Sequence, residues 1–335
     1  MSPQFPLNTF GRTLCIAVLV GPMTALPSLP AAAQTKKVAV TMIVEVPQLL
    51  DVKRGLMEEL ARSGYTEGKN LAVEYQQASG QFPTAQQIAK RFAGEKPDVI
   101  VPITTPSAIT VVQAAKDENI PVVFSTVTDP LGAKIVQTLV KPGGNVTGVS
   151  DMAPIDQHFD LIRKLAPGAK RLGVLMNPSL ANTQFYLAEI KKVAPAMGWT
   201  VVESPANKST DVQAATLNLV GKVDAIYIPN DTTVYSALEA AVKVANENKL
   251  PLFCGETRSV GRGCLASISF DYYDVGVATA QIVKQVLDGR SPGTIDVNVL
   301  KDSYKKFELH INGASAAAIG MTVPEALLKS AKKVY

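Results

Sequence analysis

Polar side chains collect in this sequence where short apolar runs rich in β-branched residues end. They are mainly hydroxyls and amides with a few carboxylates, and the candidate ligand-binding residues among them are Glu45, Thr105, Ser107, Thr126, Asp129, Asn177, Ser179, Asn182, Asn230, Asp231 and Glu256. Hydroxyls and amides can donate to a carboxylate, and acids can bind an ammonium, so the set suits a zwitterion. Helix capping is the alternative, because Ser107 and Asn182 stand where N-caps are expected. The residue types alone do not decide between the two roles.

A further candidate, Tyr272, lies in the run Asp271-Tyr272-Tyr273-Asp274. This run separates an expected strand at 265–270 from an expected helix at 275–287, where the chain would pass from one lobe to another. Its acids are placed to cap that helix, and its tyrosines are placed to reach a ligand cleft. Both roles stay open.

Motifs of the common nucleotide-binding and hydrolytic enzymes are missing from the sequence. It contains no G-x-G-x-x-G, Walker A or G-x-S-x-G pattern. Its two histidines, His158 and His310, lie outside the polar loops, and we expect both to be structural or exposed. The run 142–145 leads into a strand, so we expect a turn there and not a phosphate loop. We therefore predict a binding protein with no catalytic residue, no cofactor and no metal.

Strand and helix signals alternate from Lys37 to about Leu287, which predicts parallel sheets covered by helices. The segment 131–139 is one of the expected helices. Three stretches recur in order at an offset of roughly 130 residues, which indicates a duplicated plan. They are 38–75 with 172–203, 96–102 with 222–229, and 119–124 with 249–253. We predict an α/β fold of two doubly wound parallel-sheet lobes, with the ligand beyond the carboxyl ends of the strands.

The first 33 residues have the pattern of a signal peptide. Arg12 precedes the apolar run 14–20, and the alanines at 31–33 offer an A-x-A cleavage site. The run is far shorter than the roughly 20 residues that a membrane-spanning helix needs. We expect export to the periplasm with cleavage near Ala33; a disordered N-terminus or a poor membrane anchor is the alternative.

After cleavage the chain keeps two cysteines, Cys254 and Cys264. An oxidising compartment favours a disulfide between them, and a pair of buried free thiols is the alternative. The net charge of +4 is small for 335 residues, and Lys and Arg form no cluster. We expect no nucleic-acid partner.

Several segments are specific when taken together: 64–70 (GYTEGKN), 121–124 (PVVF), 127–130 (VTDP), 141–150 (KPGGNVTGVS), 223–227 (VDAIY) and 271–273 (DYY). In these segments the chain resembles the periplasmic substrate-binding proteins of ABC transporters, in particular the group that includes tryptophan- and tyrosine-binding members. The resemblance implies a type I periplasmic-binding fold with a three-segment hinge. It places lobe one at 34–150 plus 271–296, and lobe two at 151–270 plus 297–335.

The same resemblance implies a small ligand, often an aromatic or other hydrophobic amino acid, and a membrane permease with its ATPase as partners. Many relatives have Glu-His-Pro where this chain has Glu45-Val46-Pro47, which leaves the identity of the ligand open. The leading hypothesis is a monomeric receptor for solute uptake that closes on its ligand. A sensor that feeds a signalling partner, a receptor for a different small organic acid and an exported α/β enzyme are the alternatives. A DNA-binding regulator is excluded, because no helix-turn-helix precedes the first lobe.

Overall fold

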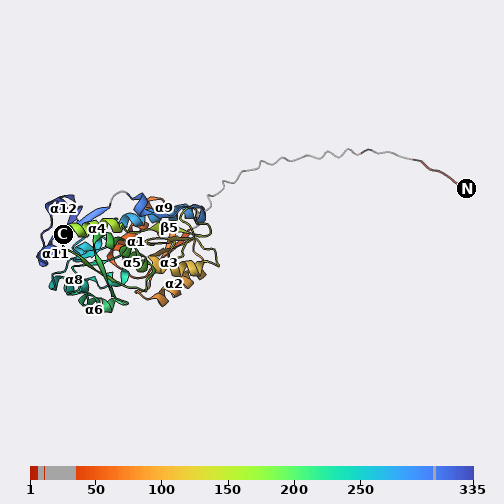
Figure 1. Ribbon diagram of the computed structural model, residues 1–335. Helices are drawn as coiled ribbons and strands as arrows, with labels where there is room; N and C mark the ends of the chain where they lie inside the picture. Colours follow the sequence, from red (N-terminus) through yellow and green to blue (C-terminus); the bar gives the residue numbers. More distant parts are fainter. Residues whose placement is uncertain (7–10, 12–34, 305–306) are drawn as a thin grey trace. The chain divides into compact units, whose positions relative to one another are not determined.

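The computed structural model describes residues 1–6, 11, 35–304 and 307–335 (Figure 1). The chain divides into Met1–Gln34 and the compact unit Thr35–Tyr335, which carries the fold. The charged start, apolar run and cleavage site of the predicted signal peptide, at 12–33, lie outside the described residues. In the described part of the chain, no helix is long and apolar enough to cross a membrane.

The first lobe is built on a six-stranded parallel sheet. Its strands, in order across the sheet, are β2 (Leu71–Gln77), β1 (Lys36–Met42), β3 (Val99–Ile103), β4 (Val122–Phe124), β5 (Val146–Ser150) and β11 (Asn298–Val299). Its helices are α1 (Pro47–Arg62), α2 (Phe82–Glu95), α3 (Thr105–Ala115), α9 (Tyr272–Leu287) and the short α10 (Leu300–Ser303). Side chains alternate along a strand, so Val38 and Val40 belong to the core that includes α1 and α9, while Ala39 belongs to the core under α2 and α3.

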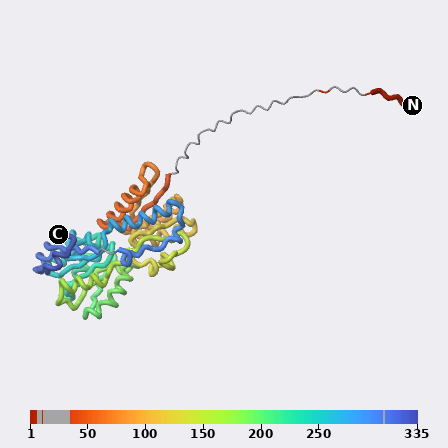
Figure 2. Tube along the Cα trace, turned by 90° about the horizontal axis from the view of Figure 1, so that it is seen from above, coloured from red at the N-terminus to blue at the C-terminus, as the bar shows by residue number. Residues whose placement is uncertain are grey.

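Helices α1 and α9 lie side by side although more than 200 residues separate them, as the orange and blue tubes of Figure 2 show. Two glycines make this close approach possible. A Cβ at Gly276 would lie 2.1 Å from the carbonyl oxygen of Val52, and one at Gly55 would lie 2.1 Å from that of Tyr273. The helix that follows Asp271 is thereby fixed to lobe one.

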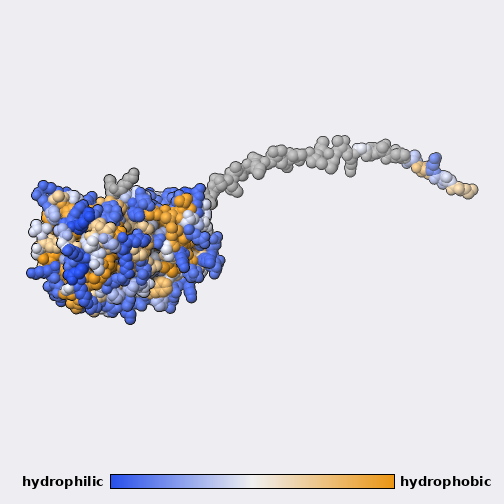
Figure 3. Space-filling model, viewed as in Figure 1, coloured by the Kyte–Doolittle hydropathy of each residue, from blue (hydrophilic) through white to orange (hydrophobic). Residues whose placement is uncertain are grey.

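The second lobe is built on a seven-stranded sheet. Its strands, in order, are β7 (Thr200–Pro205), β6 (Arg171–Met176), β8 (Ala225–Ile228), β9 (Leu252–Cys254), β10 (Ala266–Ser269), β12 (Glu308–Ile311) and β13 (Lys333–Val334), and only β10 and β12 pair antiparallel. Its helices are α4 (Ile155–Leu165), α5 (Ala181–Val193), α6 (Val212–Leu217), α7 (Thr232–Tyr235), α8 (Leu238–Glu247), α11 (Gly313–Ala318) and α12 (Glu325–Ser330). Tyr227 packs in the core with α4 and α5, and its neighbours Ile226 and Ile228 pack in the core with α6 and α8. Apolar side chains also reach the face shown in Figure 3, in patches between hydrophilic ones, as in folded proteins generally.

The same strand order occurs twice, as β2-β1-β3-β4-β5 and as β7-β6-β8-β9-β10. The predicted α/β fold of two doubly wound lobes is therefore confirmed. The chain passes between the sheets three times: at 151–154, at 270–271, and between α10 and β12.

Two expectations differ from the structure. Residues 131–134 form turns and 135–139 an irregular segment, and not a helix, because the left-handed conformation of Lys134 (φ 57°) ends the helical turn that Asp129 caps at Leu131 and Gly132. The predicted end of lobe one at residue 296 also lies too early in the sequence, since Asn298 and Val299 pair with β5 of the first lobe. A strand of two residues has no periodic pattern from which to predict it.

Candidate ligand-binding site

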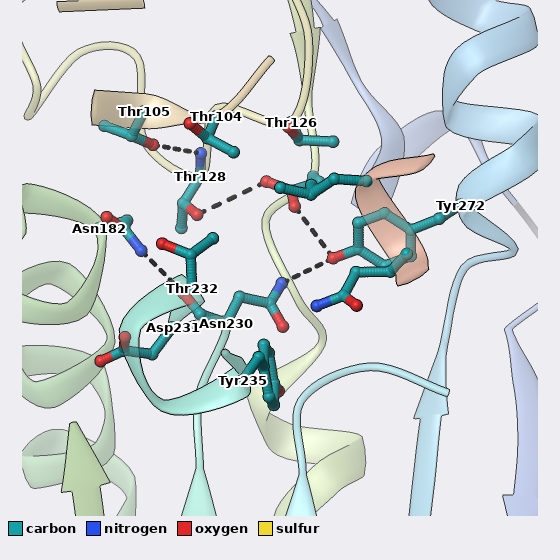
Figure 4. A pocket seen from close by; sticks show the side chains of 13 residues that line it. Thr104, Thr105, Thr126, Thr128, Asn182, Asn230, Asp231, Thr232, Tyr235 and Tyr272 are labelled. Atoms are coloured by element: carbon teal, nitrogen blue, oxygen red, sulfur yellow. Dashed lines mark hydrogen bonds between the residues drawn. The ribbon is translucent and has the colours of Figure 1, made fainter. Parts of the chain in front are cut away.

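The loops at the carboxyl ends of the strands of both sheets meet around a small cavity of about 30 Å³. Lobe one lines it with Gln48, Leu49, Thr104, Thr105, Thr126 and Thr128, lobe two with Asn182, Asn230, Asp231, Thr232 and Tyr235, and the crossing segments with Asp151 and Tyr272 (Figure 4). The position agrees with the rule that open α/β sheets bind ligands at this edge. Hydroxyls dominate on the side of lobe one, whereas lobe two contributes two amides, two hydroxyls and one acid.

A wider groove of about 760 Å³ lies next to this cavity. Its walls come from both lobes and include Glu45, Pro106, Asn177 and Ser179. Thr232 lines both the groove and the cavity. A ligand that passes from the groove to the cavity would therefore pass Thr232.

Two of the threonines that line the cavity have unusual backbone conformations. Thr104 has φ 93° and Thr126 has φ 52°. Positive φ is rare for β-branched residues and stores strain, which is typical of ligand-contacting and catalytic positions. Hydrogen bonds hold the first of these loops in place: Thr104 N donates to Ser125 O at 2.9 Å, and Thr128 N donates to Thr105 Oγ1 at 3.3 Å.

Three long helices begin at the cavity, and none of them has a side-chain cap. Helices α1, α3 and α5 follow Val46, Thr104 and Leu180, and no side chain of these three residues bonds the first turn. The first turn of a helix has N–H groups without internal partners and a partial positive charge. These three ends are suited to an anionic group such as a carboxylate.

Amide oxygens without partners are the second feature of the cavity. Among the described residues, Gln48 Oε1, Asn182 Oδ1 and Asn230 Oδ1 are buried and accept no hydrogen bond. The orientation of two of these amides is fixed, because Asn182 Nδ2 donates to Asn230 O at 2.7 Å and Asn230 Nδ2 donates to the Tyr272 hydroxyl at 2.9 Å. A buried acceptor without a donor is costly. All three residues line the cavity, and a ligand with several N–H donors would supply the missing bonds.

The Tyr272 hydroxyl connects these amides to a buried acid. It accepts from Asn230 and donates to Asp151 Oδ2 at 3.0 Å, while Thr128 Oγ1 donates to Asp151 Oδ1 at 3.5 Å (Figure 4). Burial raises the pKa of Asp151 to about 6. Asp151 belongs to one of the three crossings and Tyr272 directly follows another, so the network joins both lobes to the hinge.

The other acid at the cavity, Asp231, has a different environment. Its carboxylate caps α7, accepting from the backbone N–H groups of Thr233 and Val234, and it also accepts from the N–H of Asn177. In Figure 4 it points away from Asn230 and Tyr272. Burial raises its pKa to about 6 as well. Its oxygens are used within lobe two and not at the cavity.

The structure divides the residues predicted from the sequence into three groups. Thr105, Thr126, Asn182, Asn230, Asp231 and Tyr272 line the cavity, whereas Glu45, Asn177 and Ser179 line the groove. Ser107, Asp129 and Glu256 line neither. Ser107 Oγ accepts from Thr104 Oγ1 at 3.3 Å, and the carboxylates of Asp129 and Glu256 bind backbone N–H groups of their own loops.

Neither Ser107 nor Asn182 caps a helix, since the N-cap positions of α3 and α5 are Thr104 and Leu180. In the run at 271–274 both proposed roles are present: Asp271 caps α9, and Tyr272 lines the cavity. Cys254 and Cys264 form a disulfide.

Sequence reasoning missed seven residues of the cavity: Gln48, Leu49, Thr104, Thr128, Asp151, Thr232 and Tyr235. The three threonines belong to polar loops that the sequence singled out, so the rule of strand ends would have included them. Asp151 directly follows β5, and its place after a strand was a signal of the same kind. Gln48 and Leu49 lie in the first turn of α1, and no sequence motif marks them.

Comparison with known proteins identifies the family. Residues 37–335 match the family described as ABC transporter substrate binding protein. The chain belongs to this family. It is a family of extracytoplasmic substrate-binding proteins and not of enzymes. The chain is also 37% identical over 286 residues to the tyrosine-binding protein of Clostridioides difficile (strain R20291), covering 85% of this chain and 81% of the relative.

Two solved structures of similar sequence differ in how well they superpose on this chain. A Streptococcus pneumoniae ABC domain in complex with L-Trp has 33% identity, covers 90% of this chain and 100% of its own, and gives a TM-score of 0.85. A ligand-free, open substrate binding protein with adhesive properties from Clostridium difficile has 34% identity. It covers 89% of this chain and 99% of its own, and gives a TM-score of 0.67. The two identities, 33% and 34%, are nearly the same, so they do not account for the difference in TM-score. Thr35–Tyr335 as a whole thus superposes better on the L-Trp complex than on the ligand-free, open structure.

Proposed function

We propose that this protein is the solute receptor of an ABC uptake transporter and that it closes its lobes on an aromatic amino acid, with tyrosine and tryptophan as the first candidates. The observation that carries the proposal is a set of three residues with buried, unpartnered amide oxygens, which line one cavity where three helices without side-chain caps begin. An amino acid carries the two groups that these features lack. Its ammonium has three N–H donors, and its carboxylate is an anion.

The α-carboxylate is assigned to lobe one, at the first turn of α3. Thr104 and Thr105 begin this helix, and the hydroxyls of Thr126 and Thr128 lie at the same cavity. Hydroxyl and backbone N–H donors together bind carboxylates well, since charge-assisted hydrogen bonds are stronger than neutral ones. Positive φ at Thr104 and Thr126 is explained if the strain serves to direct these donors.

The α-ammonium is assigned to Gln48, Asn182 and Asn230, whose amide oxygens would each receive one N–H. Gln48 belongs to lobe one, and the two asparagines belong to lobe two. A ligand held by all three contacts both lobes and therefore favours their closed arrangement by its differential affinity. Asp151 adds a negative charge at the cavity above a pH of about 6.

The side chain of the ligand needs more room than the present cavity offers. About 30 Å³ is far below the roughly 300 Å³ of small ligand sites. Leu49, Tyr235 and Tyr272 supply apolar surface at the cavity, and the groove beyond Thr232 is the adjoining space. We infer that the ligand enters while the lobes are apart and that the lining side chains rearrange around its ring.

The physiological role follows from the family. A receptor that closes on its ligand would deliver it to a membrane permease that an ATPase drives, and it would do so as a monomer in the periplasm after cleavage near Ala33. Fractionation of the exporting cell and N-terminal sequencing of the mature protein test this location. A mature chain that keeps residues 1–33 would contradict it.

The ligand assignment is tested by isothermal titration calorimetry with L-tyrosine and L-tryptophan. Asn182→Ala is expected to weaken binding about 10- to 100-fold, the usual effect of losing a hydrogen bond to a charged group. The matched control is Asn218→Ala, an exposed amide outside the cavity, which should leave affinity unchanged. Equal affinities of the two variants would overturn the assignment of the ammonium. Binding of a sugar or a simple organic acid, with neither amino acid bound, would overturn the ligand class.

A further inference from the structure

A disulfide-closed loop follows β9 in the second lobe. Cys254 and Cys264 are both buried, and their Cα atoms lie 6.0 Å apart. Inside the loop, the fully buried carboxylate of Glu256 accepts hydrogen bonds from Arg258 N at 2.6 Å and from Ser259 N at 2.9 Å. The disulfide therefore closes the two ends of the loop, and Glu256 fixes the backbone at Arg258.

The side chain of Arg258 crosses to the other lobe. Its Nε lies 2.7 Å from Asp51 Oδ2, on the second turn of α1. The Asp51 side chain is 11% exposed and that of Arg258 is 47% exposed, so the acid is the buried partner. Within residues 35–304 and 307–335, this is the only ion pair that joins the two lobes.

Asp51 also has a partner of its own lobe. Its Oδ1 accepts from Arg54 Nη2 at 2.9 Å, one turn further along α1. If the lobes separate, Asp51 loses Arg258 but keeps Arg54. A buried carboxylate without any partner would be very costly, and the second arginine avoids this cost. The contact with Arg258 can thus break and form again as the lobes move.

We propose that Arg258 and Asp51 form a latch that stabilises the closed arrangement of the lobes, and that the Cys254–Cys264 loop positions Arg258 for it. The inference rests on the proposed closure of the lobes around a ligand, but it concerns residues outside the cavity. Gln48 and Leu49 stand one turn before Asp51 on α1, so the latch holds lobe two against the same helix that lines the cavity. Arg258 and Asp51 are positioning residues and touch no ligand.

The latch changes ligand affinity through the population of the closed state. The observed affinity falls in proportion to the fraction of molecules that can close. Partly exposed ion pairs contribute modestly, and the expected loss is about two- to fivefold. It should arise mainly from faster ligand dissociation. Salt screens such a pair, so added salt should weaken binding by the wild type and have less effect on a variant without Arg258.

The first test compares Arg258→Ala, Asp51→Asn and the double variant by calorimetry and stopped-flow dissociation of L-tryptophan and L-tyrosine. Each single variant should lose two- to fivefold in affinity, and the double variant should be no weaker than Arg258→Ala, because both remove one interaction. The matched control is Arg54→Ala, which removes the other arginine of Asp51 and leaves the contact between the lobes. Additive losses, or a loss with Arg54→Ala equal to that with Arg258→Ala, would overturn the latch.

The second test concerns the loop. A variant with both Cys254→Ala and Cys264→Ala should lose affinity in the wild-type background and lose nothing further in the Arg258→Ala background. Thermal melting of each variant verifies that it is folded, since loss of a disulfide lowers stability by itself. A loss of affinity that is the same in both backgrounds would show that the loop acts independently of Arg258.

The third test does not depend on the ligand. Dyes at Lys90→Cys on α2 and Lys243→Cys on α8, both exposed positions of different lobes, report the distance between the lobes by single-molecule energy transfer. The lifetime of the closed state should shorten two- to fivefold in Arg258→Ala and should not shorten in Arg54→Ala. If neither amino acid binds the wild type, the proposed ligand class fails while this measurement still decides the latch. Equal closed-state lifetimes in wild type and Arg258→Ala would overturn it.

Discussion

Replacing Asp151 with asparagine removes a charge that the fold buries between its lobes. The residue is 3% exposed, and its two oxygens accept hydrogen bonds from Tyr272 and Thr128. Burial raises its pKa from 3.8 to about 6. Asparagine has nearly the same shape, keeps one oxygen acceptor and cannot ionise.

The sign and size of the effect follow from the pKa of Asp151. Between about pH 4 and pH 6 the folded protein holds a proton that the unfolded chain has released, so the free energy of unfolding falls as the pH rises through this window. A shift of about two pKa units corresponds to about 3 kcal/mol. At pH 8 the buried, ionised carboxylate lowers the free energy of unfolding of the wild type by this whole amount, whereas Asp151→Asn has no charge to bury. The variant should therefore gain up to about 3 kcal/mol relative to the wild type between pH 4 and pH 8.

The assay is urea unfolding of both proteins at several pH values from 4 to 8. Asp231→Asn is the control, because burial raises the pKa of Asp231 to about 6 too. Its carboxylate accepts from three backbone N–H groups, which the amide of asparagine can replace only in part. This control should show a similar dependence on pH together with a loss of stability at every pH. A difference between wild type and Asp151→Asn that does not change from pH 4 to pH 8 would refute the reasoning.

Two further predictions concern packing and the loop that is not a helix. Gly276→Ala would bring a Cβ within 2.1 Å of Val52 O, so α1 and α9 must separate. Urea unfolding should show that the free energy of unfolding falls by about 1–3 kcal/mol. An unchanged unfolding midpoint would contradict the close approach of the two helices. Asp129→Ala removes the acceptor of Leu131 N and Gly132 N, so the free energy of unfolding should fall by about 1 kcal/mol with no change in amino-acid affinity by calorimetry. Weaker binding by that variant would instead indicate that Asp129 contacts the ligand.

The two lobes could be predicted from the sequence because each lobe repeats the same local signals in the same order. The segment at 131–139 shows where such signals fail. Ile135 and Val136 are both buried there, but turns bury them as well as a helix would, and the left-handed conformation of Lys134 (φ 57°) ends the helical turn that begins at Asp129. The pairing of β11 with β5 depends on contacts that are distant in sequence, and two residues carry no pattern of their own.

The candidate site could be located from the sequence but not resolved into individual contacts. Strand ends are local features, so the loops around Thr105, Thr126 and Asn230 were predictable. The direction of a side chain is set by bonds across the fold: Asp231 and Glu256 turn to backbone N–H groups, and no local pattern distinguishes them from Asn230. Gln48 is a polar residue in the first turn of an amphipathic helix, which ordinarily indicates exposure to solvent. It is buried because it lies at the cavity, which residues of both lobes enclose.

The central claim is that the cavity binds both charged groups of an amino acid. It is tested most directly by titrating the purified protein with L-tryptophan, with tryptamine, which lacks the carboxylate, and with indole-3-propionate, which lacks the ammonium. The account predicts that L-tryptophan or L-tyrosine binds with a stoichiometry of one and that each analogue binds at least about 100-fold more weakly, since each loses several charge-assisted hydrogen bonds. An analogue that binds as tightly as its parent amino acid would contradict the claim, and so would a protein that binds neither amino acid.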